Sequence, residues 1–174
     1  MVIPMKADED NYHIIKRRTR VCGVVVLIYE FFALIYQICR LLEAYYDILP
    51  VMNIYFGLFA STACLLVLQF ASLVFATFYF VGSTKEDRSL LHLWVISVAV
   101  LVFLKAILVS YNIYAYNSLT HEKPFAHVFW GNSQLAVFLA TLLVYIFPII
   151  LGVVMSRKIK ARIVASYEER QILL

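Results

Sequence analysis

Charged residues are scarce in this sequence: they make up 15% of the 174 residues, against 63% for hydrophobic residues. Soluble domains use about 25% charged and about 45–50% apolar residues, so the composition excludes an ordinary soluble domain. The length also leaves no room for a soluble catalytic domain beside the membrane spans. The net charge of +4 comes from residues expected at the membrane faces, and nucleic acid is therefore not an expected partner.

Cysteines are few, and their positions exclude another class. The sequence has three, Cys22, Cys39 and Cys64, and no pair falls in an expected outer loop, so no disulfide framework is predicted. Claudins and true tetraspanins carry characteristic cysteines in such loops, and this sequence has none there, so neither group is expected. Cys22 lies at the expected cytosolic edge of the first span and is a candidate for S-acylation.

Motifs of catalysis are also absent. The sequence contains no HExxH, no GxSxG, no glycine loop that could hold a phosphate, and no group of His and carboxylate ligands. We therefore expect no enzyme activity, no cofactor and no metal site.

Long hydrophobic runs are what the sequence does have. Four of them, at about 21–39, 54–80, 90–110 and 135–155, reach the length of about 20 residues that crosses a bilayer. They predict an all-α integral membrane four-helix bundle that forms one domain over 1–174, with an N-terminal segment at 1–20 and a tail at 156–174. A polar turn is expected at 82–89, and an aromatic interfacial loop at 111–133.

The distribution of positive charge predicts the orientation of the bundle. Twelve of the 15 Lys and Arg residues lie in 1–20, 82–89 and 156–174, whereas only two lie in 40–53 and 111–133. Cytosolic segments carry the excess of positive charge in membrane proteins. Both termini are therefore predicted to be cytosolic, and membrane lipids are an expected partner.

One positive charge, Lys105, lies inside the third run. A charge within a span is costly unless it has a partner or reaches the interface. Glu30, in the first run, lies about six residues nearer the cytosolic edge, a difference in depth of roughly 9 Å. The Lys105 side chain leans toward the N-terminus of its helix, which is the cytosolic side, and can cover most of that gap. An intramembrane ion pair between Glu30 and Lys105 is the prediction, and extension of the Lys105 side chain to the interface is the alternative.

Small residues recur along one stripe of the second run. Gly57, Ser61, Cys64 and Ala71 are spaced so that they share a helix face. Such stripes let helices approach closely in lipid, so this one predicts helix packing.

Two sorting signals are predicted for the cytosolic segments. Glu169, four residues before the pair Leu173-Leu174, resembles an acidic dileucine signal, and Tyr12 with Ile15 resembles a tyrosine-based signal. Clathrin adaptors are therefore a candidate partner. An extended tail would let the dileucine reach up to roughly 45 Å from the membrane.

The turn Gly82-Ser83-Thr84-Lys85-Glu86-Asp87-Arg88-Ser89 leads into Leu90-Leu91-His92-Leu93-Trp94. This pattern resembles that of small four-span proteins of invertebrates, which are distantly similar to the LAPTM family of lysosome-associated membrane proteins. The resemblance implies a four-span protein of endosomal or lysosomal membranes. The tail has no proline, so the proline-tyrosine motifs that LAPTM proteins use to recruit ubiquitin ligases are missing. Related insect proteins of the pasiflora type are similar to septate-junction components.

Three functions follow from these observations. The first is a non-enzymatic four-span protein of endosomes or lysosomes that acts through helix contacts with other membrane proteins or with itself. The second is a structural component of septate-type junctions at the plasma membrane. The third is a transporter or channel subunit that uses Glu30 and Lys105.

Overall fold

The computed structural model describes residues 4–48, 56–119 and 124–172, and within these ranges the protein is all-α. Its helices are α1 (Pro4–Ile48), α2 (Phe56–Lys85), α3 (Arg88–Leu119) and α4 (Pro124–Ile172). Each of the four has a segment long and apolar enough to cross a membrane. The chain therefore has the build of a multi-pass membrane protein.

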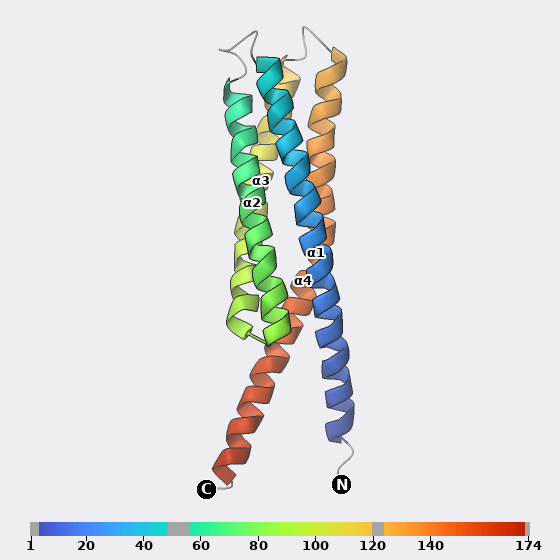
Figure 1. Ribbon diagram of the computed structural model, residues 1–174, viewed down its shortest axis with the longest axis vertical. Helices are drawn as coiled ribbons and strands as arrows, with labels where there is room; N and C mark the ends of the chain where they lie inside the picture. The colour runs from blue at the N-terminus through green and yellow to red at the C-terminus, as the bar shows by residue number, and fades with distance from the viewer. Residues whose placement is uncertain (1–3, 49–55, 120–123, 173–174) are drawn as a thin grey trace.

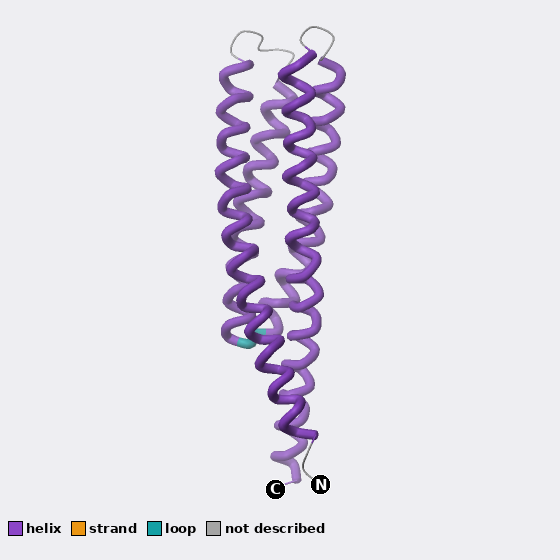
Figure 2. Tube along the Cα trace, turned by 90° about the vertical axis from the view of Figure 1, so that its right-hand side faces the viewer, coloured by secondary structure: helices purple, strands orange, loops and turns teal. Residues whose placement is uncertain are grey.

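The four helices run antiparallel to their neighbours in one elongated bundle (Figures 1 and 2). Helix α1 packs against α2 and α4, and α3 packs against the same two helices. Both termini lie at one end, here called the terminal end, and the opposite end is called the distal end (Figure 1). Consecutive long helices in a bundle pack in this up-and-down manner when the connections between them are short.

The helices are longer than the hydrophobic runs predicted. Helix α1 begins at Pro4, within the segment expected to precede the first span, and α4 continues to Ile172 through the expected tail. The interfacial loop expected at 111–133 is wrong in large part, because α3 continues to Leu119 and α4 begins at Pro124. Polar residues extend these helices past the apolar segments, since a hydropathy pattern marks depth in a membrane and not the ends of a helix.

The turn between α2 and α3 is also tighter than the predicted 82–89. Helix α2 ends at Lys85, and Glu86 takes a positive φ of 60°. The Asp87 N–H then donates to the Gly82 carbonyl at 2.9 Å, the long bond of a Schellman motif. The Asp87 carboxylate accepts from the Ser89 N–H at 2.8 Å and so caps α3.

A dense core fills the half of the bundle nearer the terminal end. We call it the terminal core, and each of its members is at most 2% exposed: Val26, Ala76, Tyr79, Leu91, Trp94, Val98 and Met155. Two glycines make room for its largest members. A Cβ at Gly23 or at Gly152 would lie 3.3 Å from the ring of Tyr79, so a side chain at either position would require the ring or the helix to shift by a few tenths of an ångström.

The outward surface of the helices is strongly apolar. Val67, Phe103, Leu143 and Phe147 are between 66% and 70% exposed. Such exposure would be a liability in water, whereas lipid chains would solvate it. The exposed apolar side chains and the hydropathy of the four helices therefore both indicate a membrane protein.

Candidate functional site

Four polar side chains, one from each helix, meet in the interior and form what we call the central polar cluster: Glu30, Gln69, Lys105 and Tyr145. Each is at most 5% exposed. Lys105 Nζ donates to Gln69 Oε1 at 2.8 Å. Gln69 Nε2 and the Tyr145 hydroxyl donate to the two carboxylate oxygens of Glu30. The cluster thus connects all four helices.

Gln69 lies between the two charged groups of this cluster. Its Oε1 accepts a hydrogen bond from Lys105 Nζ, and its Nε2 donates a hydrogen bond to the Glu30 carboxylate. The sequence predicts a direct pair between Glu30 and Lys105, whereas the structure connects the two through this amide. Lys105 is 5% exposed, so it does not extend to the interface as the alternative required.

A second group of polar side chains lies nearer the distal end. In this distal polar cluster, Ser61 donates to Asn112 Oδ1, and Asn112 Nδ2 donates to Gln134 Oε1 at 2.9 Å. The three residues come from α2, α3 and α4 and are at most 5% exposed. Helix α1 contributes Gln37, which is 6% exposed.

Two atoms in this region have no hydrogen-bond partner among the described residues. They are Gln37 Oε1, an acceptor, and Gln134 Nε2, a donor. Each belongs to a buried amide, and buried polar groups without a partner are rare because they are costly. Tyr36 and Ser133, the preceding residues on the same two helices, bond to each other at 2.8 Å. The two amides therefore lie at one level of the bundle.

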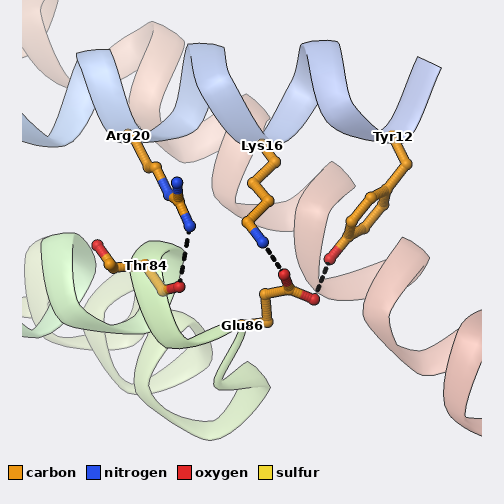
Figure 3. Close-up of polar contacts among 5 residues, drawn as sticks. All are labelled: Tyr12, Lys16, Arg20, Thr84 and Glu86. Carbon is orange, nitrogen blue, oxygen red and sulfur yellow. Dashed lines mark hydrogen bonds and ion pairs between the residues drawn. The ribbon is translucent and has the colours of Figure 1, made fainter. Parts of the chain in front are cut away.

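A third set of contacts joins the helices at the terminal end (Figure 3). We call Tyr12, Lys16, Arg20, Thr84 and Glu86 the terminal clasp. Tyr12 and Lys16 of α1 donate to the two oxygens of the Glu86 carboxylate in the turn, and Arg20 Nη2 donates to the Thr84 carbonyl at 3.1 Å. From α4, the guanidinium of Arg162 lies 3.6 Å from the centre of the Tyr12 ring.

The clasp changes the acidity of its carboxylate. Burial raises the pKa of Glu86, but the hydrogen bonds from Lys16 and Tyr12 and the charges of Lys16 and Arg162 lower it by more. The net pKa is therefore below the ordinary value. The folded protein favours the ionised carboxylate.

The residues of the predicted sorting signals are placed as follows. Tyr12 lies in α1, is 2% exposed and is held by the clasp, while Ile15 is half-buried beside the terminal core. Tyr12 thus has a partner within the bundle, and an adaptor could reach it only if the clasp opened. Glu169 lies in α4, and Leu173 and Leu174 lie outside the described residues.

The segment after Met155 is helical up to Ile172, as part of α4, so the reach of an extended tail does not apply to it. A helix rises only 1.5 Å per residue, so the distance from Met155 to Glu169 is about 21 Å and not roughly 45 Å. The side chains of 161–167 are all exposed. The many charged residues of this segment favoured a polar tail, although Ile159, Ile163 and Tyr167 recur at the four-residue spacing of one helix face.

The small residues of α2 do not share one environment. Ser61 is buried in the distal polar cluster, Ala71 is half-buried, and Gly57 faces the Tyr111 hydroxyl of α3. Cys64 is instead exposed and lines an apolar groove between α2 and α3. The candidate acylation site, Cys22, is half-buried against the terminal core.

The bridging role of Gln69 and the distal polar cluster were not foreseen from the sequence. A signal was nevertheless present. Gln37 follows Glu30 at the seventh position along α1, and Asn112 follows Lys105 at the seventh position along α3. Because residues seven apart share a helix face, polar pairs of this spacing in two apolar helices indicate a polar row along the inside of a bundle.

No known protein family, characterised protein or solved structure matches this chain. The resemblance to LAPTM-like and pasiflora-type proteins therefore stays a prediction.

Proposed function

We propose that the protein is a non-enzymatic four-span membrane protein that acts by binding other membrane proteins through its outer helix faces. The polar side chains of the central polar cluster are engaged with one another in the interior. What remains for a partner is the lipid-facing surface.

The observation that carries this proposal is the groove between α2 and α3. It has a volume of about 480 Å³ and is lined only by apolar side chains and one thiol: Ala63, Cys64, Val67, Leu68, Leu104, Ile107 and Leu108. Small residues such as Ala63 and Cys64 lower the surface of a helix and let a second helix approach closely. A helix of a partner protein, or of a second copy, fits this description.

Endosomal or lysosomal membranes are the proposed location. This rests on the dileucine-like end of the chain and on the positive charge that favours cytosolic termini. The long helical stalk of α4 supports it, because it would hold Glu169 clear of the membrane where a cytosolic adaptor could bind.

A variant that fills the groove tests the function. We expect Ala63→Trp to abolish recovery of the membrane proteins that cross-link to the parent protein through a bifunctional thiol reagent at Cys64. The indole adds bulk where a partner helix must approach, and overpacking of a well-packed core costs about 1–3 kcal/mol, so we expect a similar cost at this contact. The measurement is mass spectrometry of cross-linked material purified from native membranes.

Leu143→Trp is the matched control, because Leu143 is 69% exposed on the outer face of α4, away from the groove. It should leave the cross-linked proteins unchanged. Equal recovery from the Ala63→Trp variant and the parent would contradict the proposed binding face. Cross-linked partners drawn from cell junctions, with the parent protein at the plasma membrane, would favour the junction function instead.

A further inference from the structure

Lys and Arg gather at the terminal end of the bundle. Within 16–20, 84–92 and 156–162, ten residues are basic and only two are acidic. At the distal end, 36–55 and 110–134 together hold two basic and three acidic residues. The chain therefore carries a strong positive charge at one end only.

The two carboxylates of the terminal end are already engaged. Glu86 is held by Lys16 and Tyr12 in the terminal clasp, and Asp87 accepts from the Ser89 N–H and caps α3. Five cations remain that are exposed and make no ion pair with another described residue: Arg17, Arg18, Lys85, Arg157 and Lys160. We call these five residues the basic belt.

Contacts between the helices place the basic belt at one level of the bundle. Arg20, on the helical turn of α1 that carries two members, donates to the Thr84 carbonyl of α2 at 3.1 Å. Ser156 Oγ, beside the α4 members, lies 2.8 Å from His92 Nε2 of α3. Helix α3 begins four residues before His92, across the short turn from the α2 member. This turn marks the level in Figure 1, and α1 and α4 continue past it.

The surface directly on the distal side of the basic belt is apolar. Val21 of α1, Leu93 of α3 and Ile150 of α4 are between 45% and 56% exposed. The belt therefore lies where an apolar outer surface gives way to a charged one. In a membrane this is the level of the lipid headgroups.

We infer that the basic belt binds phospholipids whose headgroup carries one net negative charge, of which phosphatidylserine is the example, in a shell around the terminal end of the bundle. Guanidinium and ammonium groups donate strong hydrogen bonds to the phosphate oxygens, and each cation at the membrane surface adds to the attraction of anionic lipid. The inference rests on the membrane placement that the proposed function also requires, but it requires no partner protein.

The arrangement of the belt favours several singly charged lipids over one polyvalent headgroup. Arg17 and Arg18 are turned about 100° from each other around α1, and Arg157 and Lys160 about 60° around α4. Lys85 belongs to a third helix. A polyvalent headgroup requires cations that converge on it, whereas these five are exposed on three different helices.

The test is electron paramagnetic resonance of the protein reconstituted in phosphatidylcholine vesicles with a trace of spin-labelled lipid. Lipids in contact with the protein lose motion, so the restricted fraction compares the association of labelled phosphatidylserine with that of labelled phosphatidylcholine. We expect the parent to favour phosphatidylserine by about two- to threefold at about 0.15 M salt and to lose most of this preference at about 1 M, where charges are screened within about 3 Å. Equal association of the two lipids at the lower salt overturns the inference.

A pair of substitutions tests the residues. Arg18→Gln combined with Arg157→Gln removes two of the five members and should reduce the excess of phosphatidylserine by roughly two-fifths. The control, Lys6→Gln combined with Arg170→Gln, removes the same charge from the same helices, but twelve or more residues farther from the bundle. This distance of about 18 Å exceeds the screening length of about 8 Å, so the control should keep the preference. Equal loss in both variants overturns the assignment to the belt.

Phosphatidylinositol 4,5-bisphosphate distinguishes a shell from one polyvalent site. An amount equimolar with the protein should leave the preference for phosphatidylserine nearly unchanged, because a shell has places for several lipids. Loss of the preference overturns the shell. Flotation of the protein with the vesicles tests the membrane placement by itself: a protein that does not float contradicts the placement and the inference together, whereas a floating protein without a lipid preference contradicts the inference alone.

Discussion

At the scale of single residues, the amide of Gln69 provides a hydrogen-bond partner for both buried charged groups of the central polar cluster. An amide both donates and accepts hydrogen bonds, so this one side chain accepts from Lys105 and donates to Glu30. Both charges then stay in the interior without contact between them. Single hydrogen bonds within membranes are worth about 0.6 kcal/mol, and the cluster therefore stabilises the bundle mainly because its members would be costly to leave unpaired.

Removing one charge should accordingly cost more than removing both. We expect Lys105→Leu and Glu30→Leu each to lower the free energy of unfolding by about 3–5 kcal/mol, because each leaves the opposite charge buried alone. The double variant should be more stable than the worse single. Unfolding by sodium dodecyl sulfate in mixed micelles measures all three.

Ser110→Ala, on the exposed face of α3, is the control and should change stability by no more than about 0.5 kcal/mol. A double variant no more stable than the worse single would show that the two charges are not coupled.

How much of this site could be predicted differs between its members. Lys105 and Glu30 stand out because each is a lone charge in an apolar run. Gln69 and Tyr145 do not, since an amide or a phenol in a span is common and only the packing of four helices shows which of them converge. The depth estimate placed the two charges near one another, but no spacing rule could place an amide between them.

At the scale of elements, the turn between α2 and α3 is held from outside by α1. Glu86 carries a positive φ, which costs a non-glycine residue about 1 kcal/mol or more. Its side chain is placed by that conformation to meet Lys16 and Tyr12 (Figure 3). The sequence predicted a turn here, but ended α2 at Gly82 because glycine is the usual residue in that position.

The clasp makes stability depend on pH in a definite direction. The folded pKa of Glu86 is lowered by its partners against the effect of burial. Its contribution is therefore complete above the ordinary value of 4.5 and is lost as the pH falls below that value toward the lowered one. We expect Glu86→Gln to be less stable than the parent at neutral pH by up to about 1 kcal/mol.

This difference should shrink as the pH falls below the ordinary value, where the parent carboxylate gains a proton and resembles the amide. Thermal unfolding in detergent at several pH values measures it. Lys16→Met, which removes the main partner, should reduce the same pH dependence. A difference between parent and Glu86→Gln that stays constant at acidic pH would contradict the assignment.

At the scale of the whole molecule, the composition predicts four apolar helices, and the structure has them within the described residues. Their true ends were not predictable from hydropathy. The polar extension of α1 back to Pro4 and of α4 to Ile172 depends on helix propensity and on contacts such as that of Arg162 with Tyr12, and neither is recorded in an apolar pattern.

The location of the protein should depend on its last two residues. We expect replacement of Leu173 and Leu174 by Ala to move a tagged protein from endosomes or lysosomes to the cell surface, because the adaptor would lose its apolar contact. Fluorescence microscopy with organelle markers measures the change. Tyr12→Phe is the control: it keeps the buried ring and should leave the distribution unchanged. An unaltered distribution of the dileucine variant would contradict the sorting role.

Because α4 is one continuous helix, both the distance of Ile172 from the bundle and its angular position around the helix axis are fixed. Each residue of a helix turns the chain by about 100° and advances it by 1.5 Å. Deleting one residue between 160 and 166 would therefore swing Ile172 a quarter-turn or more around the axis, while hardly changing its distance from the bundle. Deleting seven residues, about two turns, would restore the angular position of Ile172 and shorten the part of α4 after Met155 by about 10 Å. A partner that recognised one face of this end of α4 would therefore lose its contact on deletion of one residue and regain the correct orientation on deletion of seven.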